Sequence, residues 1–427
     1  MGDFNRNPSG KNQFPHNAEQ EEKIAAALHE YHRNNVTNYK TISGLLAADH
    51  NICISSKTVQ RRLEGLGLYA AKKTMTRLSF SDAEQLVVTE MDRDLAKRAG
   101  VRTIKAKVAR NSGEIHPRAV VSQIMHTHDP AAFAGREPTA KKIFRVAKHP
   151  LGPNEKWACD GHDKLYKIGF PLYAFVDDAT GLYLAQWICP SNRLAHIVAY
   201  MFLDLVERTG GMPYQVTTDC GSETTELFAV VNTLRNLFHP TFDPTGEVPP
   251  HVYLRSVHNI SVERSWLRLR LDFGDNAVLA FDEGVIQGWY KSHDPDHFEL
   301  CQFLWSRVLQ ASLNESVAFR NVVRMRKQPG KPGPSGMSRH EAYSMPERWG
   351  GQDCLLPIPK DVARQMKQDL GGAGLLEFTK PEFAVRAQVV LDSLEPVALT
   401  LENGWKLFRV MLPLVFSERD DFAVIQL

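Results

Sequence analysis

The strongest helical periodicity in the chain lies between segments that have the pattern of short strands. Apolar residues recur there at spacings of 3, 1, 3, 1 and 3, namely Leu194, Ile197, Val198, Met201, Phe202 and Leu205. Ser191 precedes them as a helix cap, and Gly210-Gly211 follows as a stop. A helix between two strands is a crossover connection, which joins parallel strands. The pattern therefore predicts an α/β fold in which the next strand, YQVTTD, lies parallel to an earlier one.

The segments before this helix are expected to form three antiparallel strands. NEKWACDGHDKL supplies the first, and GFPLYAFVDDATGLYLAQWICP contains two apolar runs around a turn, which is typical of a β-hairpin. Asp177 and Asp178 lie in that turn and are interpreted as turn residues. Together with YQVTTD and the later VYLRSV, these segments predict a mixed five-stranded sheet flanked by helices.

Three acidic residues occupy this framework in the order strand, strand, helix: Asp160, Asp219 and Glu263. The crossover helix would bring Asp219 beside Asp160. Each acid alone has an ordinary explanation, as a turn residue, a helix cap or a solvated helix residue. Together they predict a site for Mg²⁺ or Mn²⁺, because hard cations prefer oxygen ligands. Since two such ions promote phosphoryl transfer, the leading hypothesis is a magnesium-dependent polynucleotidyl transferase.

Residues 151 to 330 resemble the catalytic core of retroviral integrases and related transposases. The segments WACDGHDKL, VDDATG, TTDCGSE and VHNISVERSW match that family's pattern in order and in element type. The resemblance implies an RNase H-like fold in which Asp160, Asp219 and Glu263 are the catalytic and metal-binding carboxylates. MRKQPGKPGPSGMSRHEAY after the core is similar to cellular integrase-core proteins of eukaryotic genomes.

The chain also departs from retroviral integrases in two respects. The gap of 43 residues between Asp219 and Glu263 is wider than in those enzymes, and it contains NLFHPTFDPTGEVPPH, which is predicted to be a loop. The chain has no His/Cys zinc-binding N-terminal domain. These differences argue against a viral integrase in the narrow sense.

Positive charge is concentrated in the first 150 residues. They carry 24 Lys and Arg against 15 Asp and Glu, whereas the remainder carries 27 against 34. This asymmetry indicates that the first part contacts DNA phosphates and the second holds cations, with solvated lysines as the alternative. Residues 1–18 are rich in Asn, Pro, Gly and Ser and are expected to be a disordered tail.

Residues 19–72 are predicted to form a helix-turn-helix-like domain of three helices. Ser55 or Ser56 would cap the third helix, whose apolar residues face inward. Three outward residues are candidates for binding DNA: Lys57, Gln60 and Arg61. A tri-helical bundle without a nucleic-acid role is the alternative.

Residues 79–135 are predicted to form a second helical, DNA-binding-like domain. Its helices are expected at residues 81–98, at residues 101–110 and from Pro117 onward. Four of its outward basic residues are candidate DNA contacts: Arg102, Lys105, Lys107 and Arg118. The alternative is a solvated charged face on a helical linker. Residues 136–150 are expected to be a basic linker to the core.

The helix that carries Glu263 adds further candidates. Arg264, Arg268 and Arg270 are expected either to meet DNA phosphates or to pair with acids. Trp266 on the same helix is predicted to be a core residue rather than a platform for base stacking.

The region after the core is expected to begin with a long helix at residues 296–326. Residues 331–354 are predicted to be a linker rich in proline and glycine. For residues 355–427, the short apolar runs AVRAQVVLDSL and GWKLFRVMLPLVF predict a small mixed or β-rich domain of unknown role.

Composition excludes other classes of protein. No apolar run approaches the roughly 20 residues that span a bilayer, and the N-terminus lacks the apolar core of a signal peptide. The six cysteines form no CxxC pair, so neither a disulfide framework nor a zinc site is expected. We therefore expect a soluble intracellular protein, nuclear or cytoplasmic before it engages DNA, with no membrane partner.

The favoured function is metal-dependent cleavage and strand transfer of DNA by a homo-oligomer, as in the integration of a transposable element. Two alternatives stay open. One is a domesticated, catalytically inactive nucleic-acid-binding protein, and the other is an RNase H-type nuclease that uses the same metals on a different substrate.

Overall fold

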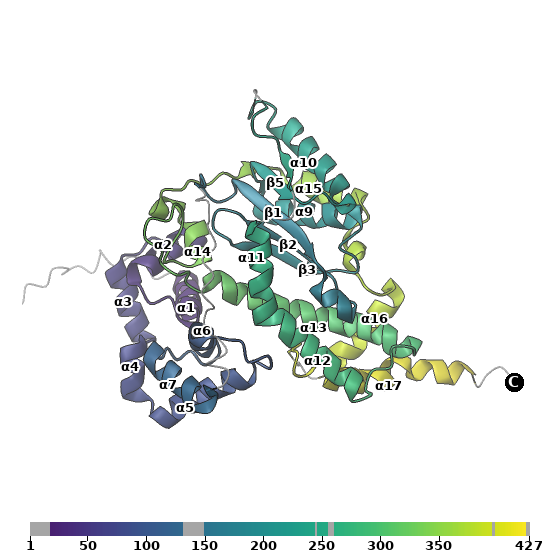
Figure 1. Ribbon diagram of the computed structural model, residues 1–427, viewed down its shortest axis with the longest axis horizontal. Helices are drawn as coiled ribbons and strands as arrows, with labels where there is room; N and C mark the ends of the chain where they lie inside the picture. Colours follow the sequence, from purple (N-terminus) through teal and green to yellow (C-terminus); the bar gives the residue numbers. More distant parts are fainter. Residues whose placement is uncertain (1–17, 131–148, 244–245, 255–259, 395–397, 424–427) are drawn as a thin grey trace, which may run out of the picture. The chain divides into compact units, whose positions relative to one another are not determined.

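The computed structural model describes residues 18–130, 149–243, 246–254, 260–394 and 398–423, and Figure 1 shows its helices and strands. The chain divides into two compact units. The first consists of the residues up to Val88 together with Val101–Thr127, and the second of Thr89–Gly100 and His128–Leu427. The tail predicted at residues 1–18 and the linker predicted at 136–150 fall almost entirely outside the described residues.

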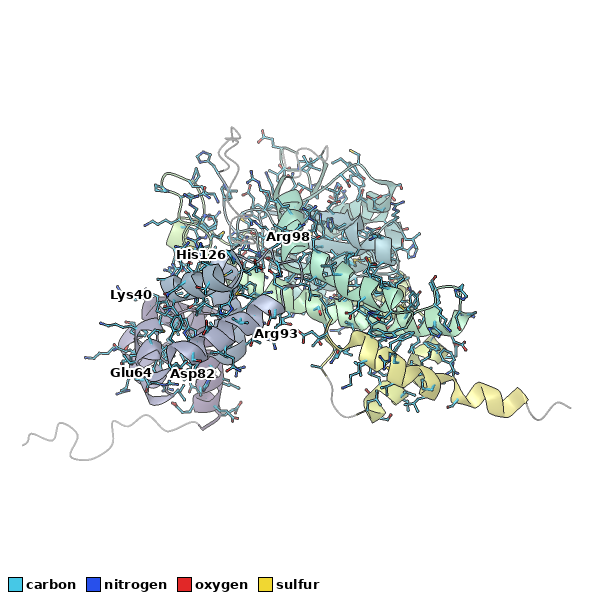
Figure 2. All side chains as sticks on the ribbon, turned by 60° about the horizontal axis from the view of Figure 1, so that its bottom comes forward. Lys40, Glu64, Asp82, Arg93, Arg98 and His126 are labelled. Atoms are coloured by element: carbon cyan, nitrogen blue, oxygen red, sulfur yellow. The ribbon has the colours of Figure 1, made fainter. Side chains whose placement is uncertain are left out.

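The first unit is all-helical, as predicted. It contains α1 (Ala18–Arg33), α2 (Tyr39–His50), α3 (Ser56–Gly65), α4 (Ala71–Arg77), most of α5 (Phe80–Asp92), α6 (Val101–Ser112) and α7 (Arg118–His128). Ser55 caps α3, since its side chain accepts a hydrogen bond from the Thr58 N–H. Figure 2 shows the side chains of this unit, with Lys40 on α2 and Glu64 on α3.

Helices from both predicted helical domains share this one unit. α1 packs against α6 as well as against α2. Polar contacts also connect the two segments, because Lys105 donates to Asn35 Oδ1 at 3.1 Å and Arg110 donates to Asn34 Oδ1 at 3.2 Å. Residues 19–72 and most of 79–127 therefore form one helical unit rather than two separate compact modules.

Residues 89–100 belong to the second unit. α5 ends at Asp92 rather than near residue 98, and the chain then contacts α12 (Asp275–Ile286). The Ala96 N–H donates to Asn276 Oδ1 at 2.9 Å, and Arg98 pairs with Asp275 at 2.6 Å. The predicted second helical domain is thus divided between the two units.

The second unit is built on a five-stranded sheet in the order β3-β2-β1-β5-β6. Its strands are β1 (Lys156–His162), β2 (Leu172–Asp177), β3 (Tyr183–Ile188), β5 (Gln215–Thr218) and β6 (His251–Tyr253). β1, β2 and β3 are antiparallel, whereas β5 runs parallel to β1 and β6 parallel to β5. The predicted mixed sheet and its parallel crossover are confirmed.

Alternate residues of β1 face two layers of helices. Trp157 and Cys159 are fully buried in a cluster with α9 (Ala195–Thr209) and α10 (Thr225–Phe238). Ala158 belongs to a second cluster, which includes side chains of α11 (Ile260–Leu269), α12 and α13 (Pro295–Val322). α9 follows the predicted periodicity but begins at Ala195 without a side-chain cap, so Ser191 does not cap it.

The predicted linker at residues 331–354 is a packed part of the second unit. It contains α14 (Arg339–Ser344) and a 3-10 turn, Pro346–Trp349, and its Glu341 is buried. Asn154, just before β1, donates to Asp353 at 2.8 Å and accepts from the Tyr343 hydroxyl at 2.9 Å. The linker prediction is wrong, because these polar contacts and buried residues fix the segment against the sheet.

The C-terminal region is helical, so the prediction of a small mixed or β-rich domain is wrong. α15 (Lys360–Asp369) packs on α9, while α17 (Gly404–Ala423) packs on α13 and on α16 (Pro381–Ser393). Buried residues recur at helical spacing, as Leu407, Met411 and Val415 do in α17. The one short strand, β7 (Leu356–Pro357), pairs with β4 (Gly211–Met212) within the part of the chain that the structure describes.

Candidate active site

Asp160 lies near the carboxyl end of β1, on the sheet face that carries α11. It is opposite Ala174 of β2 and two residues after Ala158, so strand alternation directs both side chains to the same face. The indole Nε1 of Trp266 in α11 donates a hydrogen bond of 2.9 Å to Asp160 Oδ2. The sheet thus fixes the backbone of Asp160, and α11 fixes one of its carboxylate oxygens.

Asp219 follows directly after β5, the strand parallel to β1. The register places Ala158 opposite Thr217, and continuing it by two residues brings Asp219 level with Asp160. Thr218 is buried, and its hydroxyl donates to the Asp219 carbonyl at 2.9 Å and lies 3.1 Å from His251 Nε2 in β6. The structure therefore brings the two predicted aspartates together at the carboxyl ends of two neighbouring inner strands.

The electrostatics of Asp160 indicate crowded carboxylates. Burial raises the pKa of Asp160 to about 7, and the hydrogen bond from Trp266 opposes this shift. The negative charges of Asp219 and Glu223 raise the pKa further. Burial is thus the main cause of the raised pKa of Asp160, and the two neighbouring acids add to it.

Glu263 lies on α11, three residues before Trp266. Because α11 packs against β1, the backbone of Glu263 belongs to the helix that covers the Asp160 strand. Its side chain lies outside the described part of the structure. The expected carboxylate contribution of Glu263 therefore stays a prediction.

Glu223 is an acid of this region that we did not predict as a site residue. It lies in the 3-10 turn Ser222–Thr224 before α10, and its side chain lies over Gly221, where a Cβ atom would collide with it. The sequence signal was present, since Glu223 follows the strand-end Asp219 by four residues. This closeness in sequence does not by itself place the carboxylate at the site, and it is in the folded chain that the charge of Glu223 acts on Asp160.

Trp266 connects the candidate site to the core. It is 5% exposed, which confirms the predicted core position, and its ring stacks on His162 with centroids 4.6 Å apart. His162 is two residues after Asp160 in β1, so it lies on the same face of the strand. The hydrogen bond from Trp266 to Asp160 was not predicted.

The chemistry of the donors suits a hard cation. Asp160 and Asp219 offer carboxylate oxygens, and a bound cation would relieve the repulsion between them. Among the side chains that the structure describes, which exclude that of Glu263, no group of three or more His, Cys, Asp or Glu could hold a metal ion. The described residues therefore supply part of the predicted donor set.

The structure separates the predicted DNA contacts of the first unit into exposed and half-buried residues. Lys57, Gln60 and Arg61 are exposed on α3, opposite the buried Val59 and Leu63. Among the later candidates, Arg102 and Arg118 are exposed, whereas Lys105 and Lys107 are half-buried. Burial lowers the pKa of Lys105, whose ammonium is bonded to Asn35, so Lys105 is poorly placed for a phosphate.

The basic residues of the Glu263 helix also differ in exposure. Arg264 and Arg268 are exposed on α11. Arg270 is half-buried at the start of a π-helical turn, Arg270–Gly274, that joins α11 to α12. The first two can therefore reach an external ligand, whereas Arg270 is mainly part of the helix packing.

A comparison with models of protein families finds a match in this unit. Residues 143–331 match a family model described as the integrase core domain, and this range includes Asp160, Asp219 and Glu263. A comparison with curated proteins finds no match to the chain. Within the described residues, no helix combines the length and the apolar character needed to cross a membrane. The family match confirms the resemblance to integrase catalytic cores.

Proposed function

We propose that this chain, which carries an integrase core domain, is a metal-dependent polynucleotidyl transferase that cleaves DNA and transfers the cut strand. One observation carries the proposal: Asp160 and Asp219 lie level on parallel neighbouring strands, and the helix of Glu263 packs on the Asp160 strand. The sheet order β3-β2-β1-β5-β6, with three antiparallel and then two parallel strands, supports assignment of the core to the RNase H-like folds.

In this proposal, Asp160, Asp219 and Glu263 hold two Mg²⁺ or Mn²⁺ ions. When bound, such ions supply activation of the attacking oxygen and stabilisation of the leaving oxygen in an in-line displacement. The protein supplies the placement of the ligands. The parallel strands fix the two aspartates, and the indole of Trp266 holds one oxygen of Asp160 in position.

The first unit is proposed to bind DNA. α2 and α3 pack against each other, and α3 exposes Lys57, Gln60 and Arg61 on the face away from the core. A helix with this distribution suits the major groove. Because the proposed reaction acts on DNA, we also propose that the protein works in the nucleus and binds DNA as a homo-oligomer.

The test is a nicking and strand-transfer assay on duplex DNA with Mg²⁺ or Mn²⁺. Asp160→Asn and Glu263→Gln remove one carboxylate charge each with little change in shape. We expect each to lower the rate by about a hundredfold or more, because carboxylate-bound metal supplies several kcal/mol of transition-state stabilisation. Asp361→Asn, at an exposed acid at the start of α15, is the matched control and should retain activity.

The outcomes separate the candidate functions. Equal activity of wild type, Asp160→Asn and Glu263→Gln would contradict the catalytic proposal. DNA binding by a wild-type protein that neither nicks nor transfers strands would indicate a domesticated, inactive protein. Cleavage of an RNA–DNA hybrid without cleavage of duplex DNA would indicate an RNase H-type nuclease.

A further inference from the structure

The segment between α13 and α14 is an ordered loop rather than a flexible linker. We refer to residues 323–338 as the basic loop. The Met325 N–H donates to the Met337 carbonyl at 2.8 Å, and the Gln328 N–H donates to Ser335 Oγ at 2.6 Å. The Arg324 guanidinium donates to the Gly336 carbonyl at 2.6 and 3.2 Å. These contacts join the two arms of the loop and hold its backbone in one arrangement.

The basic loop carries positive charge without any acid. It contains Arg324, Arg326, Lys327 and Lys331, all four of which are exposed, and Arg339 follows it at the start of α14. The sequence has no Asp or Glu from residue 323 to residue 340. Residues 151–427 as a whole carry more acidic than basic residues, so this concentration of cations is local.

Further arginines lie beside the loop. Arg320 of α13 and Arg339 of α14 are both largely buried. The Arg339 guanidinium donates a hydrogen bond to the Arg320 carbonyl at 3.0 Å. Burial and repulsion between these two guanidiniums lower the pKa of Arg320 to about 10, and the charge of Arg268 adds to the repulsion. Asp272 pairs with Arg320. Among the described contacts, the carboxylate of Asp272 is thus the one negative charge paired with this group of three guanidiniums, which belong to Arg268, Arg320 and Arg339.

The basic loop lies away from the acidic site along β1. A Cβ atom built on Gly333 of the loop would lie 3.1 Å from Pro150, which precedes the start of β1. One built on Gly181, in the turn between β2 and β3, would lie 3.5 Å from the Arg339 guanidinium. Asp160, by contrast, lies near the other end of β1. A ligand on the loop would therefore be held at a distance from the carboxylates.

We infer that the basic loop is a binding surface for the phosphate backbone of DNA, separate from the acidic site. An ordered loop with exposed guanidinium and ammonium groups suits a polyanion, because its cations are placed before the ligand arrives. The choice of DNA over an acidic protein rests on the proposed function. The loop would hold the duplex that flanks the reacting phosphate.

The test compares two double variants of the full chain. Arg326→Gln with Lys327→Gln removes two exposed loop cations. Lys380→Gln with Lys406→Gln removes two exposed cations of the C-terminal region, just before α16 and on α17. Binding is measured by fluorescence anisotropy with a labelled duplex of mixed sequence, between about 50 and 200 mM salt. The measurement is made without divalent cations, so it does not depend on catalysis.

We expect the loop variant to reduce the slope of log affinity against log salt by about 2, since each phosphate contact contributes about 0.9. The control variant should change it by much less. Equal slopes for both variants would overturn the inference. So would a loop variant that loses binding to a labelled polyglutamate peptide, which represents an acidic protein, more than it loses binding to DNA. DNA binding and nicking are measured separately. If the wild-type protein does not nick DNA but its DNA binding still depends on the basic loop, the catalytic proposal is contradicted and the inference about the loop is not.

Discussion

The indole of Trp266 and the carboxylate of Asp160 are joined by a hydrogen bond of 2.9 Å across 106 residues of sequence. Trp266 is also stacked on His162, which lies on the same face of β1 as Asp160. The indole is therefore held by two contacts with one strand. This arrangement fixes α11, and with it the backbone of Glu263, relative to the aspartate that we propose as a metal ligand.

Trp266→Phe should weaken catalysis more than folding. Phenylalanine keeps the stacking on His162 but removes the N–H, which leaves Asp160 Oδ2 without this donor. A hydrogen bond to a charged group contributes about 1.5 to 3 kcal/mol, so we expect nicking to fall by roughly tenfold or more. The Mn²⁺ concentration for half-maximal activity should rise as well, because the ligand is less well positioned.

Trp289→Phe, at a partly buried tryptophan packed on the core cluster, is the control for this prediction. Both variants should unfold at similar urea concentrations. Unchanged activity and unchanged Mn²⁺ dependence of Trp266→Phe would show that the hydrogen bond has no role in positioning Asp160.

The sheet was predictable because its signals are local. The apolar period of α9 and the hairpin turn at Asp177 follow from backbone geometry, and together they place Asp219 beside Asp160. In contrast, the hydrogen bond from Trp266 depends on how α11 packs, which no local pattern records. Glu223 lies in a 3-10 turn after β5, and its charge acts on Asp160 only in the folded chain.

The two corrections after residue 330 have different physical causes. Proline and glycine are typical of flexible linkers, but in the segment after α13 they form turns that are closed by hydrogen bonds, such as that from the Met325 N–H to the Met337 carbonyl. The apolar runs of the C-terminal region were too short to distinguish strands from helices. These runs form helices because their apolar residues, at helical spacing, pack on the large cluster around α13.

His251→Gln should change the pH dependence of stability. Burial lowers the pKa of His251 to about 4, whereas an unfolded histidine titrates near 6.5, so the unfolded chain binds an extra proton between these values. The stability of the wild type is therefore fully present above pH 6.5 and falls as the pH approaches 4. The unfolding free energy of wild type relative to the variant should decrease by about 2 kcal/mol between pH 7 and pH 4.5.

Urea unfolding at several pH values measures this difference, with His293→Gln at an exposed histidine as the control. Glutamine retains a polar group near the Thr218 hydroxyl, so the pH-independent loss should be small. A pH-independent difference between wild type and His251→Gln would mean that the imidazole takes up a proton equally well in both states.

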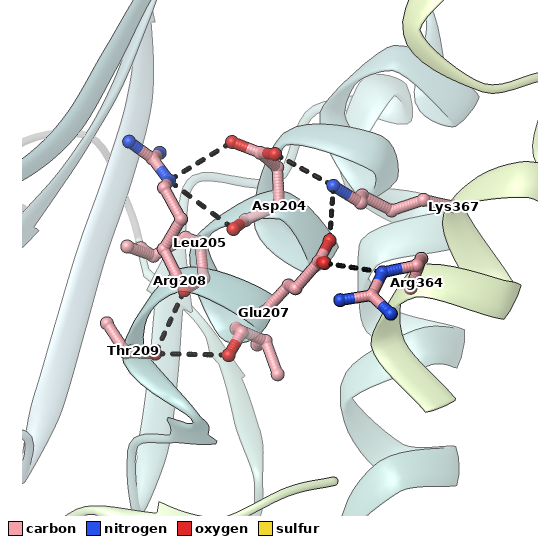
Figure 3. A network of polar contacts seen from close by, with 8 residues as sticks. Asp204, Leu205, Glu207, Arg208, Thr209, Arg364 and Lys367 are labelled. Atoms are coloured by element: carbon pink, nitrogen blue, oxygen red, sulfur yellow. Dashed lines mark hydrogen bonds and ion pairs between the residues drawn. The ribbon is translucent and has the colours of Figure 1, made fainter. Parts of the chain in front are cut away.

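Lys367→Met should loosen α15 from α9. The Lys367 ammonium lies 2.9 Å from Asp204 and 2.6 Å from Glu207, and Figure 3 shows it between these two acids. Removing it takes away the cation that the two acids share, although Arg364 still pairs with Glu207 at 2.9 Å and Arg208 with Asp204 at 3.2 Å. Because the network is partly solvated, we expect a loss of about 1 kcal/mol in the unfolding free energy.

The control is Lys360→Met, at an exposed lysine on the same helix. The difference between the two variants should shrink in high salt, because screening weakens charge pairs at a surface. An equal effect of both substitutions would show that the loss of a lysine from α15, rather than the network, lowers stability.

Gly284→Ala should destabilise the second unit even though alanine favours a helix. A Cβ atom at residue 284 would lie 2.0 Å from a ring carbon of Trp405, whose Nε1 donates to the Ala280 carbonyl at 2.8 Å. Displacing this indole should cost about 1 to 3 kcal/mol, which exceeds the gain of about 1 kcal/mol in helix propensity. Glu283→Ala, at an exposed neighbour, should be nearly neutral in urea unfolding. A stabilising Gly284→Ala would mean that the Trp405 indole does not pack against α12 at residue 284.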